Sequence, residues 1–161
     1  MRDRAIDETR RRRARLVAGG LCAALILMTA PVLRAAETAP GPEARKAELE
    51  RLIAFDRATK LDAEQQKVMA EALSPMPAPC CSDFSAATCC CKCNLARAMW
   101  GRAKQLVLAG RSAAEVRKGV HDWLARMNPS GFAGDACHKG HCGRGVSKDG
   151  CGGMRADHIT P

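Results

Sequence analysis

The chain has 161 residues, enough for one domain, and a formal net charge of +9 from 26 Lys and Arg against 17 Asp and Glu. Residues 1–36 hold eight arginines and three acids, so the remaining 125 residues carry only +4. There is no tyrosine, and three Phe and two Trp are the only aromatic residues. The sequence therefore lacks the basic stripe with interleaved aromatics that nucleic-acid binding needs, and it argues against a large doubly wound or sandwich core.

The N-terminal residues 1–36 are typical of an export signal. A basic block, Arg10–Arg13 with Arg15, precedes eighteen residues without a charge, Leu16–Leu33. Because positive charge stays on the cytoplasmic side, we expect the rest of the chain to be exported to the periplasm. Eighteen apolar residues are long for a signal peptide and just enough for a membrane-spanning helix. Cleavage near Ala36 and retention as an N-terminal membrane anchor therefore both stay open.

Residues 37–79 are predicted to be a linker followed by two helices. The linker, residues 37–42, contains two prolines and a glycine, which cannot continue a helix. An apolar stripe then predicts a helix over 43–58, and Asp62 with Gln65 forms a capping box that predicts a second helix to about Leu73. Alternating prolines in residues 74–79 end it.

Residues 80–127 are predicted to hold a cysteine cluster followed by a helical hairpin. Asn94 can cap a helix that runs to Ala109, and Gly110 suits the left-handed turn that ends it. Ser112 with Glu115 is a second capping box, and the apolar period predicts a helix to Met127. No segment shows a strand pattern.

Residues 128–161 form a Cys/Gly-rich tail too poor in apolar residues to order itself through a core, so it needs disulfides or metal. The predicted fold class is thus all-α: a small three- to four-helix bundle with a helical hairpin and a Cys/Gly-rich irregular loop and tail.

Ten cysteines, nine of them beyond residue 36, are the most informative feature of the composition. In the oxidising compartment expected for an exported chain, disulfides persist. Nine is an odd number, so at least one thiol is unpaired, intermolecular or a metal ligand, and sequence neighbours make poor disulfide partners. One interpretation is a disulfide-stapled interaction module without chemistry of its own.

A second interpretation is a non-catalytic protein that binds a soft metal, Cu(I) or Zn(II). The segment Cys137–Cys142 offers four ligands within six residues. The candidate ligands are Cys80, Cys81, Cys89, Cys91, Cys137, His138, His141, Cys142 and Cys151. Asp83 and Asp149 are interpreted as polar loop residues without a further role.

A third interpretation is thiol–disulfide chemistry by Cys90 and Cys93, which form a Cys-x-x-Cys pair just before a predicted helix. A helix N-terminus and the adjacent Lys92 both lower a thiol pKa, and the thiolate is the species that attacks disulfides. Covalent c-type haem is not expected on this chain, because its attachment requires a histidine where Asn94 follows Cys93.

Residues 90–127 resemble the CcmH-type proteins of cytochrome c maturation. The matching residues are Cys90, Cys93, Ala96, Arg97, the run Leu106–Ser112, Glu115 and Val116. The resemblance implies a small membrane-anchored helical bundle facing the periplasm. It also implies that Cys90 and Cys93 are a redox pair acting on an apocytochrome or another cysteine-containing exported protein. The chain departs from the family at Cys89 and Asn94, which stand where the family has Arg and Gln.

Overall fold

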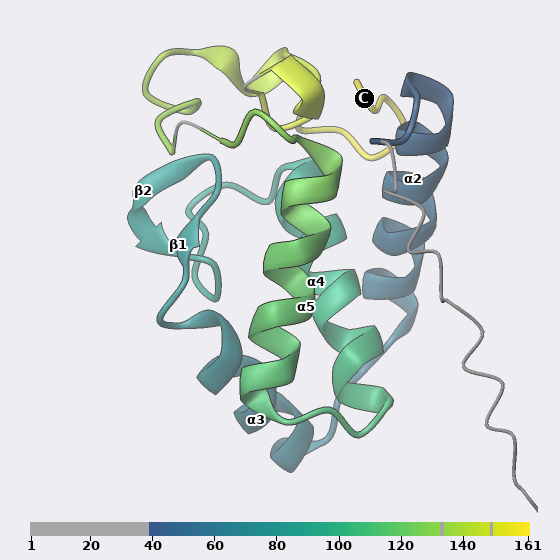
Figure 1. Ribbon diagram of the computed structural model, residues 1–161, viewed down its shortest axis with the longest axis vertical. Helices are drawn as coiled ribbons and strands as arrows, with labels where there is room; N and C mark the ends of the chain where they lie inside the picture. Colours follow the sequence, from purple (N-terminus) through teal and green to yellow (C-terminus); the bar gives the residue numbers. More distant parts are fainter. Residues whose placement is uncertain (1–38, 133, 149) are drawn as a thin grey trace, which may run out of the picture. The chain divides into compact units, whose positions relative to one another are not determined.

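The computed structural model describes residues 39–161 with the exception of residues 133 and 149. The expected signal or anchor in residues 1–36, and Asp149, lie outside the described residues. The described part is mostly helical, with α2 (Pro42–Ala58), α3 (Ala63–Leu73), α4 (Asn94–Leu108) and α5 (Ala113–Met127) (Figure 1). Among these described segments, no helix has the length and apolar character needed to cross a membrane.

The helix boundaries follow the capping residues closely. At α3 the Asp62 carboxylate accepts a hydrogen bond from the Gln65 N–H at 2.8 Å, and the Gln65 side chain accepts from the Asp62 N–H at 3.1 Å. Ser112 and Glu115 make the same reciprocal pair at the start of α5. Gly110 has φ +72° between α4 and α5, a left-handed conformation that favours glycine. Both capping boxes and the hairpin turn are therefore confirmed.

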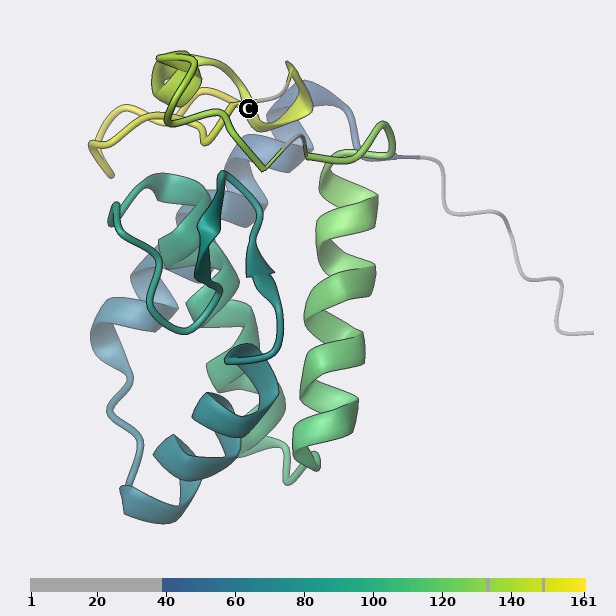
Figure 2. The ribbon, with the colours of Figure 1, turned by 90° about the vertical axis from the view of Figure 1, so that its left-hand side faces the viewer.

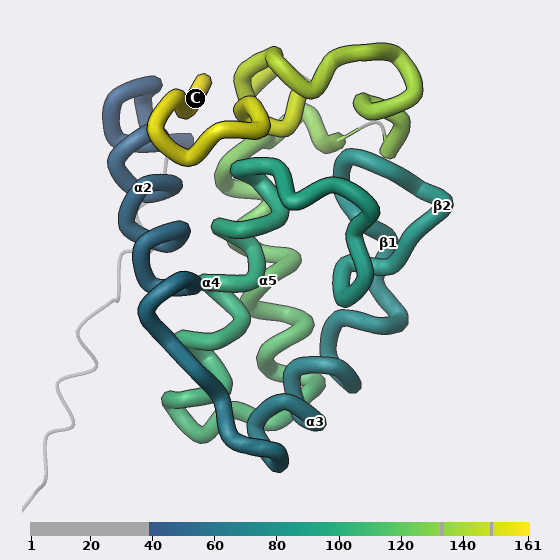
Figure 3. The backbone as a smooth tube through the Cα atoms, turned by 180° about the vertical axis from the view of Figure 1, so that it is seen from behind, coloured from purple at the N-terminus to yellow at the C-terminus, as the bar shows by residue number. Residues whose placement is uncertain are grey.

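The core lies where α2 and α5 pack against α4. α3 packs against α4 and α5 near the turn that joins these two helices (Figure 3). Leu52, Met99, Val120 and Trp123, which lie on the apolar faces expected for these helices, are almost completely buried. At Gly101 an added Cβ would lie only 2.1 Å from the Leu52 carbonyl oxygen. The backbones of α2 and α4 thus touch at a position that only glycine permits.

The mostly helical prediction is confirmed, but a small two-stranded antiparallel sheet lies between α3 and α4, where no strand was expected. β1 (Pro77–Ala78) pairs with β2 (Cys81–Ser85), with Pro77 opposite Ser85 and Ala78 opposite Cys81. This sheet could not be recognised from sequence because β1 has only two residues, one of them a proline that cannot donate to the ladder. The Ala86 N–H continues the pairing by donating to the Met76 carbonyl at 2.8 Å.

The tail crosses the end of the molecule where α4 begins and α5 ends (Figures 1 and 2). It is irregular apart from two 3₁₀ turns, η1 (His141–Gly143) and η2 (Val146–Lys148). Its return segment lies against the first turn of α4, where the backbone N–H groups of Asn94 and Leu95 donate to the carbonyls of Gly153 and Cys151 at 2.9 and 3.0 Å.

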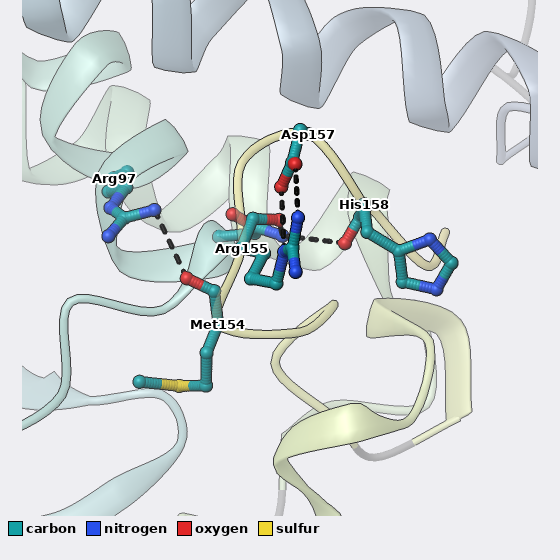
Figure 4. Close-up of polar contacts among 6 residues, drawn as sticks. Arg97, Met154, Arg155, Asp157 and His158 are labelled. Carbon is teal, nitrogen blue, oxygen red and sulfur yellow. Dashed lines mark hydrogen bonds and ion pairs between the residues drawn. The ribbon is translucent and has the colours of Figure 1, made fainter.

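Asn94 does not cap α4 as the sequence suggested. The cap is Cys93, whose Sγ accepts from the Ala96 N–H at 3.4 Å. The buried Asn94 side chain instead turns to the tail, where Nδ2 donates to the carbonyls of Gly152 at 2.9 Å and Arg155 at 2.7 Å. The half-buried Arg97 adds a hydrogen bond to the Met154 carbonyl at 3.2 Å (Figure 4). The reason for the difference is tertiary: an amide in this position satisfies more groups in the tail than at the helix end.

Candidate functional site

All nine described cysteines are free thiols, and they come from two segments that the fold brings together. The first segment is the hairpin and loop at residues 80–93, and the second is the tail from residue 137 to 151. Backbone hydrogen bonds join them: the Cys137 N–H donates to the Cys80 carbonyl at 3.2 Å, and the Ser82 N–H donates to the Gly134 carbonyl. The tail is therefore fixed over the cysteine loop (Figure 2).

Four of the thiols form a buried group, which we call the buried quartet. The Cys80 Sγ lies 3.7 Å from the Cys89 Sγ and 3.9 Å from the Cys93 Sγ. Cys151 is the fourth member: it lowers the pKa of Cys93, and its own thiol donates to the Cys142 carbonyl at 3.0 Å. Cys80, Cys93 and Cys151 are fully buried, and Cys89 is 8 % exposed. The quartet thus brings three thiols of the loop together with one thiol of the tail.

Hydrogen bonding within the quartet separates the pKa values of its thiols. Hydrogen bonds from the other three thiols, first from Cys151, hold the pKa of Cys93 well below its usual value in spite of burial. The pKa of Cys80 is raised by its hydrogen bonds with Cys89 and Cys93 and by burial. At Cys89 the hydrogen bond with Cys80 lowers the pKa, but the hydrogen bond with Cys93 and burial together raise it to about 12. The metal-free quartet therefore favours one thiolate, at the start of α4.

Two sulfur–sulfur distances in the quartet, both at Cys80, match the edge of a metal–sulfur tetrahedron. Four sulfurs placed about 2.3 Å from a central ion are about 3.8 Å apart, whereas the sulfurs of a disulfide are about 2.05 Å apart. The distances of 3.7 and 3.9 Å at Cys80 lie on either side of the tetrahedral value. Four buried thiols are the kind of donor set that a closed structural site for Zn(II) uses.

A second set of thiols, the surface group, lies at the edge of this end of the molecule. It comprises Cys90, Cys91, Cys137 and Cys142, and the Sγ atoms follow one another at 3.5, 3.8 and 3.5 Å. Cys90 is exposed and the other three are half-buried. The surface group therefore differs from the quartet in its access to solvent.

The structure places the two cysteines of the Cys-x-x-Cys pair in different groups. The thiol of Cys90 contacts Cys91, whereas the thiol of Cys93 contacts Cys80 and Cys151. Residues 90–93 are not helical, since α4 begins only at Asn94. The pair was predicted to lie just before a helix, and its second member, Cys93, is the observed cap of α4.

The two histidines among the predicted ligands also lie at different places. His138 lies beside Cys81, with 3.7 Å between its Nε2 and the Cys81 Sγ, while His141 begins η1 and is half-buried. Asp83, interpreted from sequence as a loop residue without a role, lies on β2, and its Oδ2 is 3.1 Å from the His138 Nε2. Cys81 and Asp83 are two positions apart on β2 and so share a face, a signal that requires the strand to be recognised first.

Comparison of the chain with family models, with curated proteins and with solved structures gave no match. The resemblance to CcmH-type proteins therefore stays a prediction from the sequence.

Proposed function

We propose that this protein binds a soft metal ion, Zn(II) or Cu(I), through the buried quartet and serves as a non-catalytic metal-binding protein. The observation that carries the proposal is the position of the Cys80 Sγ, 3.7 and 3.9 Å from two further buried sulfurs. Thiolates are the ligands that select these ions, and four of them in a tetrahedron suit Zn(II) best.

The protein around the quartet supports metal binding in two further ways. The Ala96 N–H already donates to the Cys93 Sγ, so the backbone at the start of α4 stabilises negative charge on that sulfur. The quartet also joins the tail to the loop, and this tail contributes few apolar side chains, among them Val146 and Ile159, to the core. A bound ion would supply stabilisation that the tail cannot obtain by burial, as in small zinc domains.

The test is a zinc titration of the reduced protein in competition with a chromophoric chelator, with two matched cysteine variants. Cys151→Ser removes a quartet ligand, while Cys90→Ser removes an exposed thiol outside the quartet. We expect the affinity of the tightest site to fall at least about 100-fold in Cys151→Ser and to stay unchanged in Cys90→Ser. Equal affinity in the wild-type protein and Cys151→Ser would reject the quartet as the site.

Thiol–disulfide exchange by Cys90 and Cys93 is the second candidate function. It is favoured by the exposure of Cys90 together with the lowered pKa of Cys93, which hydrogen bonds from Cys151, Cys80 and Cys89 hold down. The Cys90 thiolate would attack a target disulfide and release one target thiolate. Cys93 would then attack the Cys90 sulfur, leaving a protein disulfide and a fully reduced target. This second step requires Cys93 to leave the quartet.

A peptide that contains Cys-x-x-Cys-His in its disulfide form tests the second candidate. We expect Cys93→Ser, starting from the reduced protein, to trap the mixed disulfide and to prevent release of the fully reduced peptide if the pair is catalytic. Exchange at the wild-type rate in Cys93→Ser would reject it. Both proposals include the export expected from residues 1–36 and a small bundle of α2, α3, α4 and α5 as the scaffold of the cysteine end.

A further inference from the structure

Three side chains of different chemistry converge on one point between β2 and the tail. The Nε2 of His138 lies 3.7 Å from the Cys81 Sγ and 3.1 Å from the Asp83 Oδ2, and all three atoms are within 4.8 Å of one another. None of the three residues belongs to the buried quartet or to the surface group. The convergence spans 57 positions of sequence between Cys81 and His138.

The backbone fixes this arrangement from both sides. Cys81 and Asp83 are two positions apart on β2, and therefore their side chains point to the same face of the strand. The Cys137 N–H donates to the Cys80 carbonyl, and the Ser82 N–H donates to the Gly134 carbonyl. These two bonds hold the tail immediately before His138 against the residues that flank Cys81. The imidazole is thus brought to the strand by these two backbone hydrogen bonds.

The separations match those of ligands on one tetrahedral ion. With Zn–S about 2.3 Å, Zn–N about 2.05 Å and Zn–O about 2.0 Å, tetrahedral angles place S and N about 3.6 Å apart and N and O about 3.3 Å apart. The observed distances are 3.7 and 3.1 Å. Both agree with the expected edges to within about 0.2 Å.

Hydrogen bonding and nucleophilic catalysis explain the cluster less well. The thiol and the carboxylate face the same ring nitrogen, and a single hydrogen on Nε2 can serve only one of them. A catalytic Cys–His–Asp arrangement would place the carboxylate on the other ring nitrogen, so that it orients the base. A cation, by contrast, uses the lone pairs of all three atoms at once.

We propose that Cys81, Asp83 and His138 bind a second divalent ion of the Zn(II) class, with the fourth position open to solvent. Cys81 is buried, whereas the side chains of Asp83 and His138 are 67 % and 57 % exposed, so one side of the site faces water. Three protein ligands with an open position distinguish this site from the closed quartet. Binding displaces the Cys81 thiol proton to solvent, and the other two ligands bind as carboxylate and neutral imidazole.

The test compares zinc-loaded full chains of the wild-type protein, His138→Ala and the control His121→Ala. The side chain of His121 is 76 % exposed on α5. Native mass spectrometry gives zinc per chain, and X-ray absorption at the zinc edge shows whether imidazole is a ligand. We expect His138→Ala to lose one zinc and the imidazole scattering, and His121→Ala to keep both. An unchanged zinc count with retained imidazole scattering in His138→Ala would overturn the proposal.

Two further variants separate this site from the quartet. Asp83→Asn alters an exposed ligand that folding does not need, and we expect it to weaken the same zinc at least about tenfold. Cys151→Ser should lose the quartet zinc and keep the imidazole-bound zinc. A wild-type spectrum without any imidazole ligand would reject the second site and leave the quartet untouched, so the two proposals fail separately.

Discussion

Replacing Asn94 with alanine should loosen the tail while leaving the helices in place. The Asn94 side chain is fully buried and its Nδ2 donates to the carbonyls of Gly152 and Arg155, at 2.9 and 2.7 Å. An amide nitrogen has two hydrogens, so two hydrogen bonds are lost at about 1 kcal/mol each. A local loss of about 2 kcal/mol corresponds to about 30-fold faster opening of the tail.

Hydrogen exchange followed by mass spectrometry measures this opening directly. The amide of Thr160, which donates to the Gly152 carbonyl at 3.0 Å, reports on the return segment of the tail. Arg97→Ala is the control, since it removes a single exposed bond to the same segment and should accelerate exchange less than about threefold. Exchange in Asn94→Ala within a factor of three of the wild-type rate would refute the role given to this side chain.

Three other predictions concern the scaffold and the thiols. Gly101→Ala should lower the free energy of unfolding by about 2 kcal/mol, because the new methyl group meets a backbone carbonyl of α2. In the control Gly119→Ala the methyl group meets only the flexible end of a side chain, so this variant should not be destabilised. Urea unfolding of the two variants measures the difference. Hydrogen bonds from the backbone and hydroxyl of Ser112 lower the pKa of Glu115, so this contribution to stability is present above the unfolded pKa and is lost as pH falls through the folded one. Ser112→Ala should therefore raise the pKa of Glu115 towards 4.5, as an NMR titration would show, and an unchanged pKa would contradict the capping box. Alkylation of the reduced, metal-free protein should modify Cys90 first, since it is the exposed cysteine among those described; a buried thiol that reacts faster would contradict the packing of this end.

The helices could be predicted from sequence because the signals that define them are local. A capping box joins residues three apart, so Asp62 with Gln65 and Ser112 with Glu115 determine where α3 and α5 begin whatever the rest of the chain does. Gly110 ends the first hairpin helix for an equally local reason, the left-handed φ of +72°.

Only the types of residue that form the site could be predicted from the sequence, not which of them lie together. Nine cysteines together with His138 and His141 indicated soft-metal or thiol chemistry, but the grouping depends on which loop residue faces which tail residue. Cys93 illustrates the difficulty: its spacing pairs it with Cys90, whereas its position as the cap of α4 turns it inward to Cys80 and Cys151. Asp83 was missed because its role depends on a strand whose partner is two residues long.

The most direct test of the central claim is native mass spectrometry of the protein prepared without chelator or reductant, repeated after thiol alkylation. The mass gives the bound metal and, through missing hydrogens, the number of disulfides. The metal-binding proposal predicts at least one zinc or copper ion per chain, with Cys80, Cys89, Cys93 and Cys151 reduced and protected from alkylation until the metal is removed. A metal-free chain with four resistant disulfides would contradict it and leave a stapled scaffold.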